Sequence, residues 1–238
     1  MKKTSKRHAM PGLKVIHEDR DLIVVEKASG LLTIAADDER ERTAYRLLTN
    51  YVRKGCSRSR ERVFIVHRLD RETSGLLVFA RTEAAKRYLQ DNWEQTRKHY
   101  LAVVHGSPAS DHGRINSYLA ENTALRVYST RGATRGKPAS TTWKRLRTNG
   151  VHSLLELELL TGRKHQIRVH LADIGHPVVG DRKYGPSASA ASKSMALHAF
   201  RLEFTHPFSG KRLVFEAPPP HLFTRLMSAK QQPATTGN

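Results

Sequence analysis

Cysteine is nearly absent from this chain of 238 residues, because Cys56 is the only one. A single cysteine cannot form an internal disulfide bond, so the fold needs no oxidising compartment. It also excludes a zinc finger, which takes at least two cysteine ligands. We therefore expect a fold that relies on its hydrophobic core, which a chain of this length can bury without covalent staples.

Long apolar runs and secretion signals are lacking as well. No run approaches the roughly 20 apolar residues that a membrane-spanning helix requires. Residues 1–10 are basic, but they lack the apolar stretch of a secretory signal. The expected location is the cytoplasm, and an organellar address in the basic segment stays an open alternative.

Acidic residues are few compared with basic ones. The chain has 41 Lys and Arg against 22 Asp and Glu, which gives a formal net charge of +19. Solubility alone does not require so large an excess, and such a chain attracts polyanions. Nucleic acid is the commonest polyanion, with anionic membranes and protein partners as the alternatives. The charge predicts a kind of partner and says nothing about chemistry.

The spacing of apolar residues predicts short strands that often follow one another, with a few helices between them. Strands are expected at residues 14–17, 22–26, 63–66, 76–80, 100–104, 155–159, 197–204 and 212–215, and helices at 43–52, 82–93 and 167–174. This order favours an α+β fold with an antiparallel or mixed sheet over alternating βαβ units. No glycine-rich nucleotide-binding motif is present.

We expect three segments along the chain. Residues 1–12 form a basic flexible arm, residues 13–225 form one domain, and residues 226–238 form a polar flexible tail. Within the domain, residues 54–62 read as a basic loop, and residues 106–150 carry scattered strand signals.

A polar loop between two apolar strands is the first candidate site. It runs from His67 to Gly75 and places the carboxylates of Asp70 and Glu72 among arginines. Neighbouring arginines would keep a carboxylate ionised, so that it could act as a nucleophile or as a general base. The residue types alone fit equally well a polar turn whose charges pair with one another.

A second cluster, from Thr161 to His170, crowds basic residues at the start of a helix. That placement opposes the helix macrodipole, so a carboxylate or a phosphate is expected nearby. His165 and His170 are five residues apart, which is not the spacing of a helical zinc pair, and no metal site is expected. A third candidate is Tyr100, which follows two basic residues at the start of a strand. By residue type a packed tyrosine is favoured, and stacking on a base is the alternative.

These segments resemble a known family. The stretch HRLDRETSGLLVFA is similar to the catalytic motif of RluA-type pseudouridine synthases, and TGRKHQIRVHLADIGHPVVGDRKYG resembles their later motif. KHYLAVVHG and DLIVVEKASGLL are similar to the strand with the active-site tyrosine and to the N-terminal strand and turn. The resemblance spans residues 13–217. Two departures are Ala28, where the family usually has proline, and the lack of a leading S4-like domain, as in stand-alone members.

The resemblance implies a long, largely antiparallel sheet with flanking helices and a central RNA cleft. It implies that Asp70 is the catalytic aspartate, that Tyr100 lies against the target base, and that Arg168 pairs with Asp70. Arg68 would help to displace the target nucleotide. The residues expected to bind substrate are His67, Arg68, Arg71, Thr73, Arg163, His165 and Gln166.

The implied reaction isomerises uridine to pseudouridine in structured ribosomal RNA, transfer RNA or both, with no cofactor and no metal. The enzyme would act as a monomer, without DNA or a membrane as partner. Whether Asp70 attacks the nucleotide or removes a proton from the ribose stays open. The alternatives are a non-catalytic RNA-binding protein or RNA chaperone of the same fold, and a glycosidase-like enzyme with Asp70 and Glu72 as its carboxylate pair. The strong positive charge disfavours the glycosidase.

Overall fold

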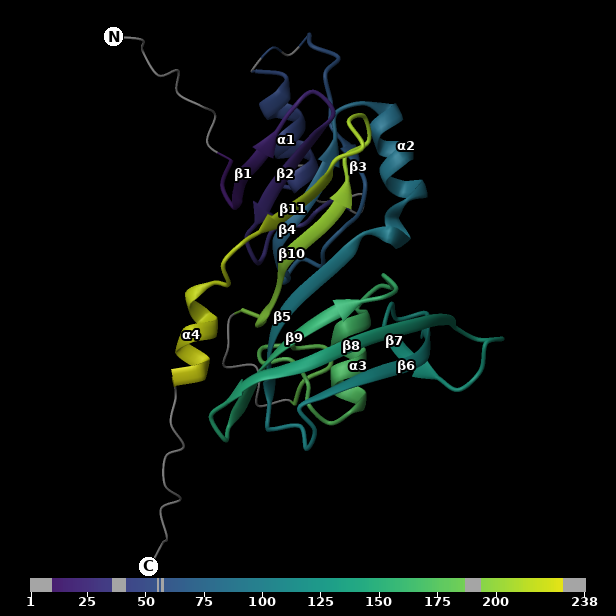
Figure 1. Cartoon of the computed structure of the whole chain (residues 1–238), viewed down its shortest axis with the longest axis vertical. Helices are drawn as coiled ribbons and strands as arrows, with labels where there is room; N and C mark the ends of the chain where they lie inside the picture. Colours follow the sequence, from purple (N-terminus) through teal and green to yellow (C-terminus); the bar gives the residue numbers. More distant parts are fainter. Residues whose placement is uncertain (1–9, 36–41, 55, 57, 187–193, 229–238) are drawn as a thin grey trace, which may run out of the picture. The chain divides into compact units, whose positions relative to one another are not determined.

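A computed structural model describes residues 10–35, 42–54, 56, 58–186 and 194–228 (Figure 1). The chain divides into two compact units. Unit one consists of Met1–Thr96 with Leu202–Ala217, and unit two of Arg97–Arg201 with Pro218–Asn238. Residues 13–225, expected as one domain, thus contribute to both units. Most of the predicted arm and tail, residues 1–9 and 229–238, lie outside the described residues.

The strands follow the hydrogen-bonded order β1-β2-β4-β10-β5-β9-β8-β6-β7, with β3 on β4 and β11 on β10. Unit one holds β1 (Leu13–Glu18), β2 (Leu22–Lys27), β3 (Phe64–Ile65), β4 (Ser74–Ala80) and β11 (Arg212–Glu216). Unit two holds β5 (Arg97–His105), β6 (His112–Glu121), β7 (Val127–Thr130), β8 (Lys137–Thr148) and β9 (His152–Leu159). β10 (Leu197–Thr205) contributes residues to both units. The predicted α+β class with a long, largely antiparallel sheet is confirmed.

In unit one, β2 and β4 are buried along their whole apolar stretches. Leu76 and Val78 pack with Leu89 of α2 (Glu83–Asp91), as a continuous apolar strand requires when both of its faces are covered. The helix starts follow from local chemistry. Thr43 caps α1 (Ala44–Val52) and Thr82 caps α2, each hydroxyl accepting the backbone N–H three residues on. After α1, the chain's single cysteine, Cys56, is exposed.

In unit two, buried leucines alternate with half-exposed glutamates along β9. Leu155, Leu157 and Leu159 are buried, while the glutamates between them are half-exposed. α3 (Gln166–Asp173) covers the end of the sheet, where Val169 packs on residues of β6, β7 and β8. The scattered strand signals of residues 106–150 correspond to these three strands.

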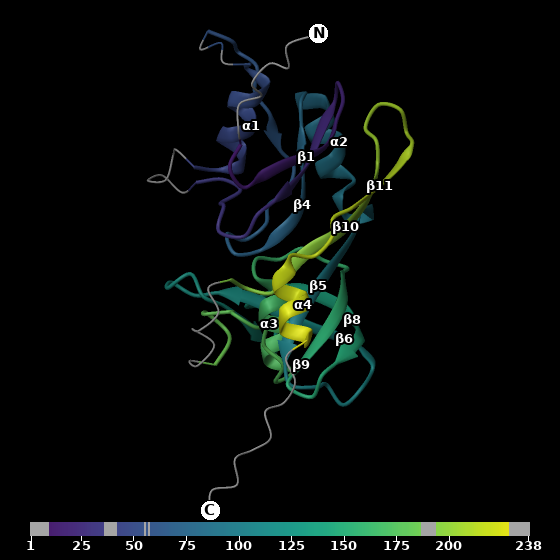
Figure 2. The ribbon, with the colours of Figure 1, turned by 90° about the vertical axis from the view of Figure 1, so that its left-hand side faces the viewer.

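A fourth helix corrects the predicted tail. α4 (His221–Ser228) continues through residues 226–228, which we expected to be flexible (Figure 2). Phe223 and Met227 are buried against Leu101 and Val103 of β5, and the Asn149 side chain donates to the carbonyls of residues 226 and 227. Apolar residues at helical spacing after the proline run were the overlooked signal. No helix within the described residues is long and apolar enough to cross a membrane.

Replacing Phe223 by alanine should lower the free energy of unfolding by about 3 kcal/mol, because a buried aromatic side chain leaves a cavity in the core of unit two. Urea denaturation measures the loss. Phe208→Ala is the matched control, since that ring is 81% exposed. Equal effects of the two substitutions would show that α4 does not hold the core.

Candidate active site

The loop that carries Asp70 is clamped at the residues before and after it. It joins β3 to β4, which pair antiparallel. The buried backbone of Leu69 exchanges two hydrogen bonds with the Thr33 hydroxyl, at 3.1 and 3.0 Å. The backbone N–H of Thr73 donates to the Asp70 carbonyl at 3.2 Å. Asp70 itself is half-buried, so its carboxylate is presented from a backbone fixed on both sides.

A buried lysine adds a further clamp. The Lys27 side chain is fully buried, and its ammonium donates to the carbonyls of Ala28, Leu31 and Arg71, at 3.1, 2.7 and 3.1 Å. Burial lowers the pKa of Lys27 to about 8, against the opposing effect of the Glu72 and Asp70 carboxylates. The Arg71 carbonyl lies one residue after Asp70, so the ammonium ties the turn at residues 28–31 to the candidate loop.

Sequence reasoning missed Lys27 as part of the site. The lysine was read only as the first residue of a turn, Lys27 to Gly30. A lysine that ends an otherwise apolar, buried strand was the available signal, because a buried ammonium needs partners.

Of the other predicted residues of this loop, His67 and Thr73 are packed into the fold, whereas the side chains of Arg68 and Arg71 are exposed. The His67 ring stacks on Trp93 at 4.4 Å between centroids, and its Nε2 accepts from the Val78 backbone at 3.1 Å. Thr73 is buried. Arg68 and Arg71 have exposed side chains, as contacts with a polyanion require.

In unit two, Arg168 forms a buried, two-pronged ion pair with Asp181. Its Nε and Nη2 donate to the two carboxylate oxygens at 2.7 and 2.9 Å, and the backbones of Lys183 and Tyr184 donate to the same carboxylate. Burial acts to raise the pKa of Asp181, but the hydrogen bond and charge of Arg168 outweigh it, so the pKa is lowered. The guanidinium also lies 5.1 Å from the Tyr184 ring centroid.

Sequence reasoning did not identify Asp181, although it lies in the GDRKYG part of the quoted motif. The predicted pairing of Arg168 with Asp70 joins residues of the two units and stays a prediction.

Tyr100 lies on the face of the unit-two sheet that α3 covers. It is opposite Leu157 in the register of β5 and β9, and Leu157 is opposite Trp143 of β8. Thr141, two residues before Trp143 on the same strand, hydrogen-bonds to His170 of α3. Tyr100 is nine-tenths buried, which fits packing in the core as well as a ring at the edge of a site.

The segment before α3 is held by Gln166. Its side-chain oxygen accepts from the Thr161 hydroxyl and the Arg163 backbone, and its nitrogen donates to Ser140 and Thr141. These four bonds use the full capacity of a buried amide, which favours a positioning role over the predicted direct contact with substrate.

His165, next to Gln166, adopts a left-handed backbone with φ 54° and hydrogen-bonds to the Tyr184 hydroxyl at 2.8 Å. Lys164 forms an ion pair with Glu121, and this hydrogen bond lowers the pKa of Glu121. Glu121 is thus one carboxylate of the kind expected near the basic helix start.

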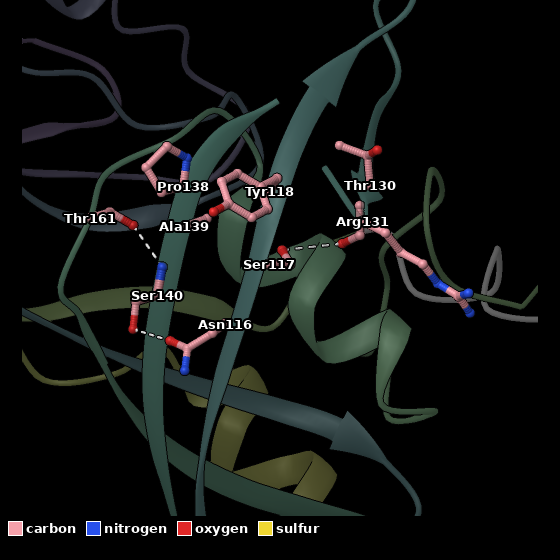
Figure 3. A pocket seen from close by; sticks show the side chains of 10 residues that line it. Asn116, Ser117, Tyr118, Thr130, Arg131, Pro138, Ala139, Ser140 and Thr161 are labelled. Atoms are coloured by element: carbon pink, nitrogen blue, oxygen red, sulfur yellow. Dashed lines mark hydrogen bonds between the residues drawn. The ribbon is translucent and has the colours of Figure 1, made fainter. Parts of the chain in front are cut away.

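A hollow of about 620 Å³, with serine, threonine and asparagine among its lining residues, borders this network in unit two (Figure 3). The Ser140 backbone donates to the Thr161 hydroxyl at 2.9 Å, and the Ser140 hydroxyl donates to Asn116 at 2.7 Å. Arg131 is its only charged lining residue. Several of its polar groups hydrogen-bond to one another, and Thr161 also donates to Gln166, so we assign the hollow to support of the loop at Gln166.

One group of residues in the described chain has the spacing of a metal site: Asp19, Asp21 and His206. The His206 Nδ1 accepts from the backbones of Phe208 and Ser209, at 3.2 and 3.0 Å, so its Nε2 carries the proton and points to Asp19. A protonated Nε2 cannot ligate a cation, and this cluster therefore does not fit a metal ion.

Comparison with known proteins identifies the family of the chain. The family model described as RNA pseudouridylate synthase matches residues 21–173. The chain is 38% identical over 229 residues to the ribosomal large subunit pseudouridine synthase D of Nitrosomonas europaea, covering 91% of this chain and 65% of that protein. It is 35% identical over 216 residues to the dual-specificity RNA pseudouridine synthase RluA of Pasteurella multocida, covering 88% of this chain and 94% of that protein.

Two solved structures share the fold. Human RNA Pseudouridylate Synthase Domain Containing 4 matches with a TM-score of 0.74 at 23% identity, covering 88% of this chain and 90% of that chain. Human RNA Pseudouridylate Synthase Domain Containing 1 matches with a TM-score of 0.72 at 24% identity, covering 94% of this chain and 98% of that chain. From the family match and the identity over nearly the full length of the Pasteurella protein, the chain belongs to the RluA-type RNA pseudouridine synthases, which are isomerases.

Proposed function

We propose that the chain converts selected uridines of structured ribosomal RNA, transfer RNA or both to pseudouridine, with Asp70 as the catalytic carboxylate and no cofactor. The clamped loop of Asp70 is the observation that carries the proposal. One relative's name refers to the large ribosomal subunit, which supports ribosomal RNA, and the other's refers to dual specificity, which supports more than one kind of RNA substrate. We further propose a monomer in the cytoplasm, where both RNAs are found.

The reaction breaks the bond from the uracil nitrogen to the ribose and forms a bond from a ring carbon to the same ribose atom. The ring nitrogen gains a proton and the carbon loses one, so atoms and charge balance without an oxidant, a group donor or a metal. An ionised Asp70 can serve either by attack on the nucleotide or by proton removal from the ribose. Both roles need a carboxylate held close to the sugar after the base has left its stack.

The remaining predicted residues take their proposed roles around Asp70. Arg168 pairs with Asp70 while Asp181 holds its guanidinium, since a guanidinium has five donors and one carboxylate does not use them all. Tyr100 stacks on the uracil. Arg68 helps to displace the nucleotide, and the RNA backbone lies along the exposed residues Arg71 and Arg163. The central cleft that would hold this RNA remains part of the proposal.

Asp70→Asn should reduce turnover by about 10⁴-fold or more while RNA affinity stays close to that of the native protein. Asparagine keeps the shape of the side chain but can be neither an anionic nucleophile nor a base. Because the product has the same mass as the substrate, a chromatographic nucleoside assay on ribosomal and transfer RNA measures turnover. Glu72→Gln, in the same loop, is the control and should remain active. An active Asp70→Asn enzyme would refute the assignment, and loss of activity in both variants would favour a carboxylate pair.

The role of Tyr100 can be tested with a pair of substitutions. Tyr100→Phe keeps the ring and should retain RNA affinity but slow the final proton step, where the hydroxyl is a candidate acid or base. Tyr100→Ala should also lose stacking worth about 1–3 kcal/mol. Rates, affinities and melting temperatures of both variants are compared. A tyrosine that only packs in the core would instead leave the Phe variant fully active and the Ala variant active but less stable.

Asp181→Asn should cut turnover, because Arg168 loses its anchor, and should lower stability by about 3 kcal/mol at neutral pH. The pKa of Asp181 is lowered in the folded protein, so its carboxylate stabilises the fold above the unfolded-state pKa of about 3.9. That contribution disappears as the pH falls through the lower folded-state value. The difference from the native protein should therefore shrink below about pH 4.

Urea denaturation from neutral to acidic pH measures this difference. Glu83→Gln removes a carboxylate from an exposed ion pair with Arg87 and should change stability little at any pH. A stability loss in Asp181→Asn that stays constant down to pH 3 would show that the buried ion pair is not its cause.

A further inference from the structure

A basic groove of about 790 Å³ lies in unit two, outside the residues to which the proposed function assigns a catalytic role. Its walls are the ends of β6 and β7, the loop between β7 and β8, and the segment before α3. The residues that give it its chemical character are Glu121, Tyr128, Arg135, Lys137, Arg163 and Lys164.

The charge of the groove is unbalanced. Four cationic side chains line it against a single carboxylate, Glu121, and that carboxylate is occupied by Lys164. Arg135 and Lys137 are exposed, and no carboxylate among the described residues forms an ion pair with either. Cations that are held together without acidic partners repel one another, so the groove favours an anionic ligand.

The geometry of the groove favours a nucleotide strand over a single small anion. The Arg163 Nε donates to the Pro138 carbonyl at 3.1 Å, which fixes its stem beside Lys137 at the start of β8, while Arg135 comes from the loop between β7 and β8. Tyr128 adds a ring that is 44% exposed. Cations that track a backbone, together with an aromatic ring on which a base can stack, are the features of single-strand binding sites.

We propose that this groove binds single-stranded nucleotides of the substrate RNA that flank the target uridine, with phosphates on Arg135, Lys137 and Arg163 and one base on Tyr128. The inference rests on the proposed function, because it takes RNA as the substrate. Arg168 lies five positions after Arg163, so the strand would leave the groove close to the start of the helix that carries Arg168.

The test compares two double variants on the same strand and its preceding loop. Arg135→Ala with Lys137→Ala removes two groove cations. Lys144→Ala with Arg147→Ala removes two exposed cations of β8 that lie outside the groove, so both proteins lose the same charge. The probe is a short fluorescent oligouridine strand, titrated at several salt concentrations, and a short RNA duplex serves for comparison.

The groove variant should bind oligouridine about tenfold more weakly than the control variant, and its salt slope should fall by about 1.4, from two lost phosphate contacts at about 0.7 each. Tyr128→Ala should weaken binding of the strand by about tenfold, Tyr128→Phe should not, and neither should change binding of the duplex. Melting temperatures of all variants should match that of the native protein, because these side chains are exposed.

Equal affinity and salt slope in the two double variants would overturn the proposal. So would equal weakening of strand and duplex, which would indicate a general polyanion surface. Unchanged RNA binding in the groove variant would leave a protein partner as the remaining occupant. The nucleoside assay on the native protein separates the two proposals: an inactive native protein refutes the proposed function, whereas an active one with indistinguishable double variants refutes only the groove.

Discussion

The buried ammonium of Lys27 is the interaction on which the geometry of the Asp70 loop depends. An ammonium removed from water costs several kcal/mol unless its donors find acceptors. Three backbone carbonyls provide them, two from the turn after β2 and one from the residue after Asp70. Neither segment can move away without leaving a charge unsatisfied, so the loop is held in place before any substrate arrives.

In unit two, a buried ion pair is likewise held in place by several hydrogen bonds. Arg168 and Asp181 are both buried, and the carboxylate collects backbone donors as well as the guanidinium. The buried charges of Lys27, Arg168 and Asp181 are therefore each held by more than one hydrogen bond, whereas exposed cations such as Arg135 and Lys137 have no ion-pair partner among the described residues. The cationic side chains thus fall into two groups. A few are buried and hold the local backbone in place, and the exposed ones favour the binding of RNA.

Local sequence patterns predicted those helices and strands that are determined by residues close together in the sequence. The helices expected at 43–52 and 82–93 and the strand expected at 155–159 each depend on residues within a few positions, and each is confirmed. The partners of Lys27 and Arg168 were missed. The Arg71 carbonyl is distant from Lys27 in the sequence, and the contact of Arg168 with Asp181 depends on a turn that no periodicity of apolar residues reveals. Gln166 illustrates the same limit. The family resemblance suggested contact with substrate, and only the fold shows that its amide is already saturated. The resemblance to a family predicted the fold class and the activity class that composition alone could not.

The exposed Cys56 has a practical consequence. As the chain's only thiol, it allows a single dye or spin label to be attached by thiol chemistry without any engineered residue. The label would lie just beyond α1, at the start of the arginine-rich segment 54–62. RNA arriving at that segment would change the local environment of the probe. The arrival of RNA could then be followed in real time and separately from the chemical step, which leaves mass and charge unchanged.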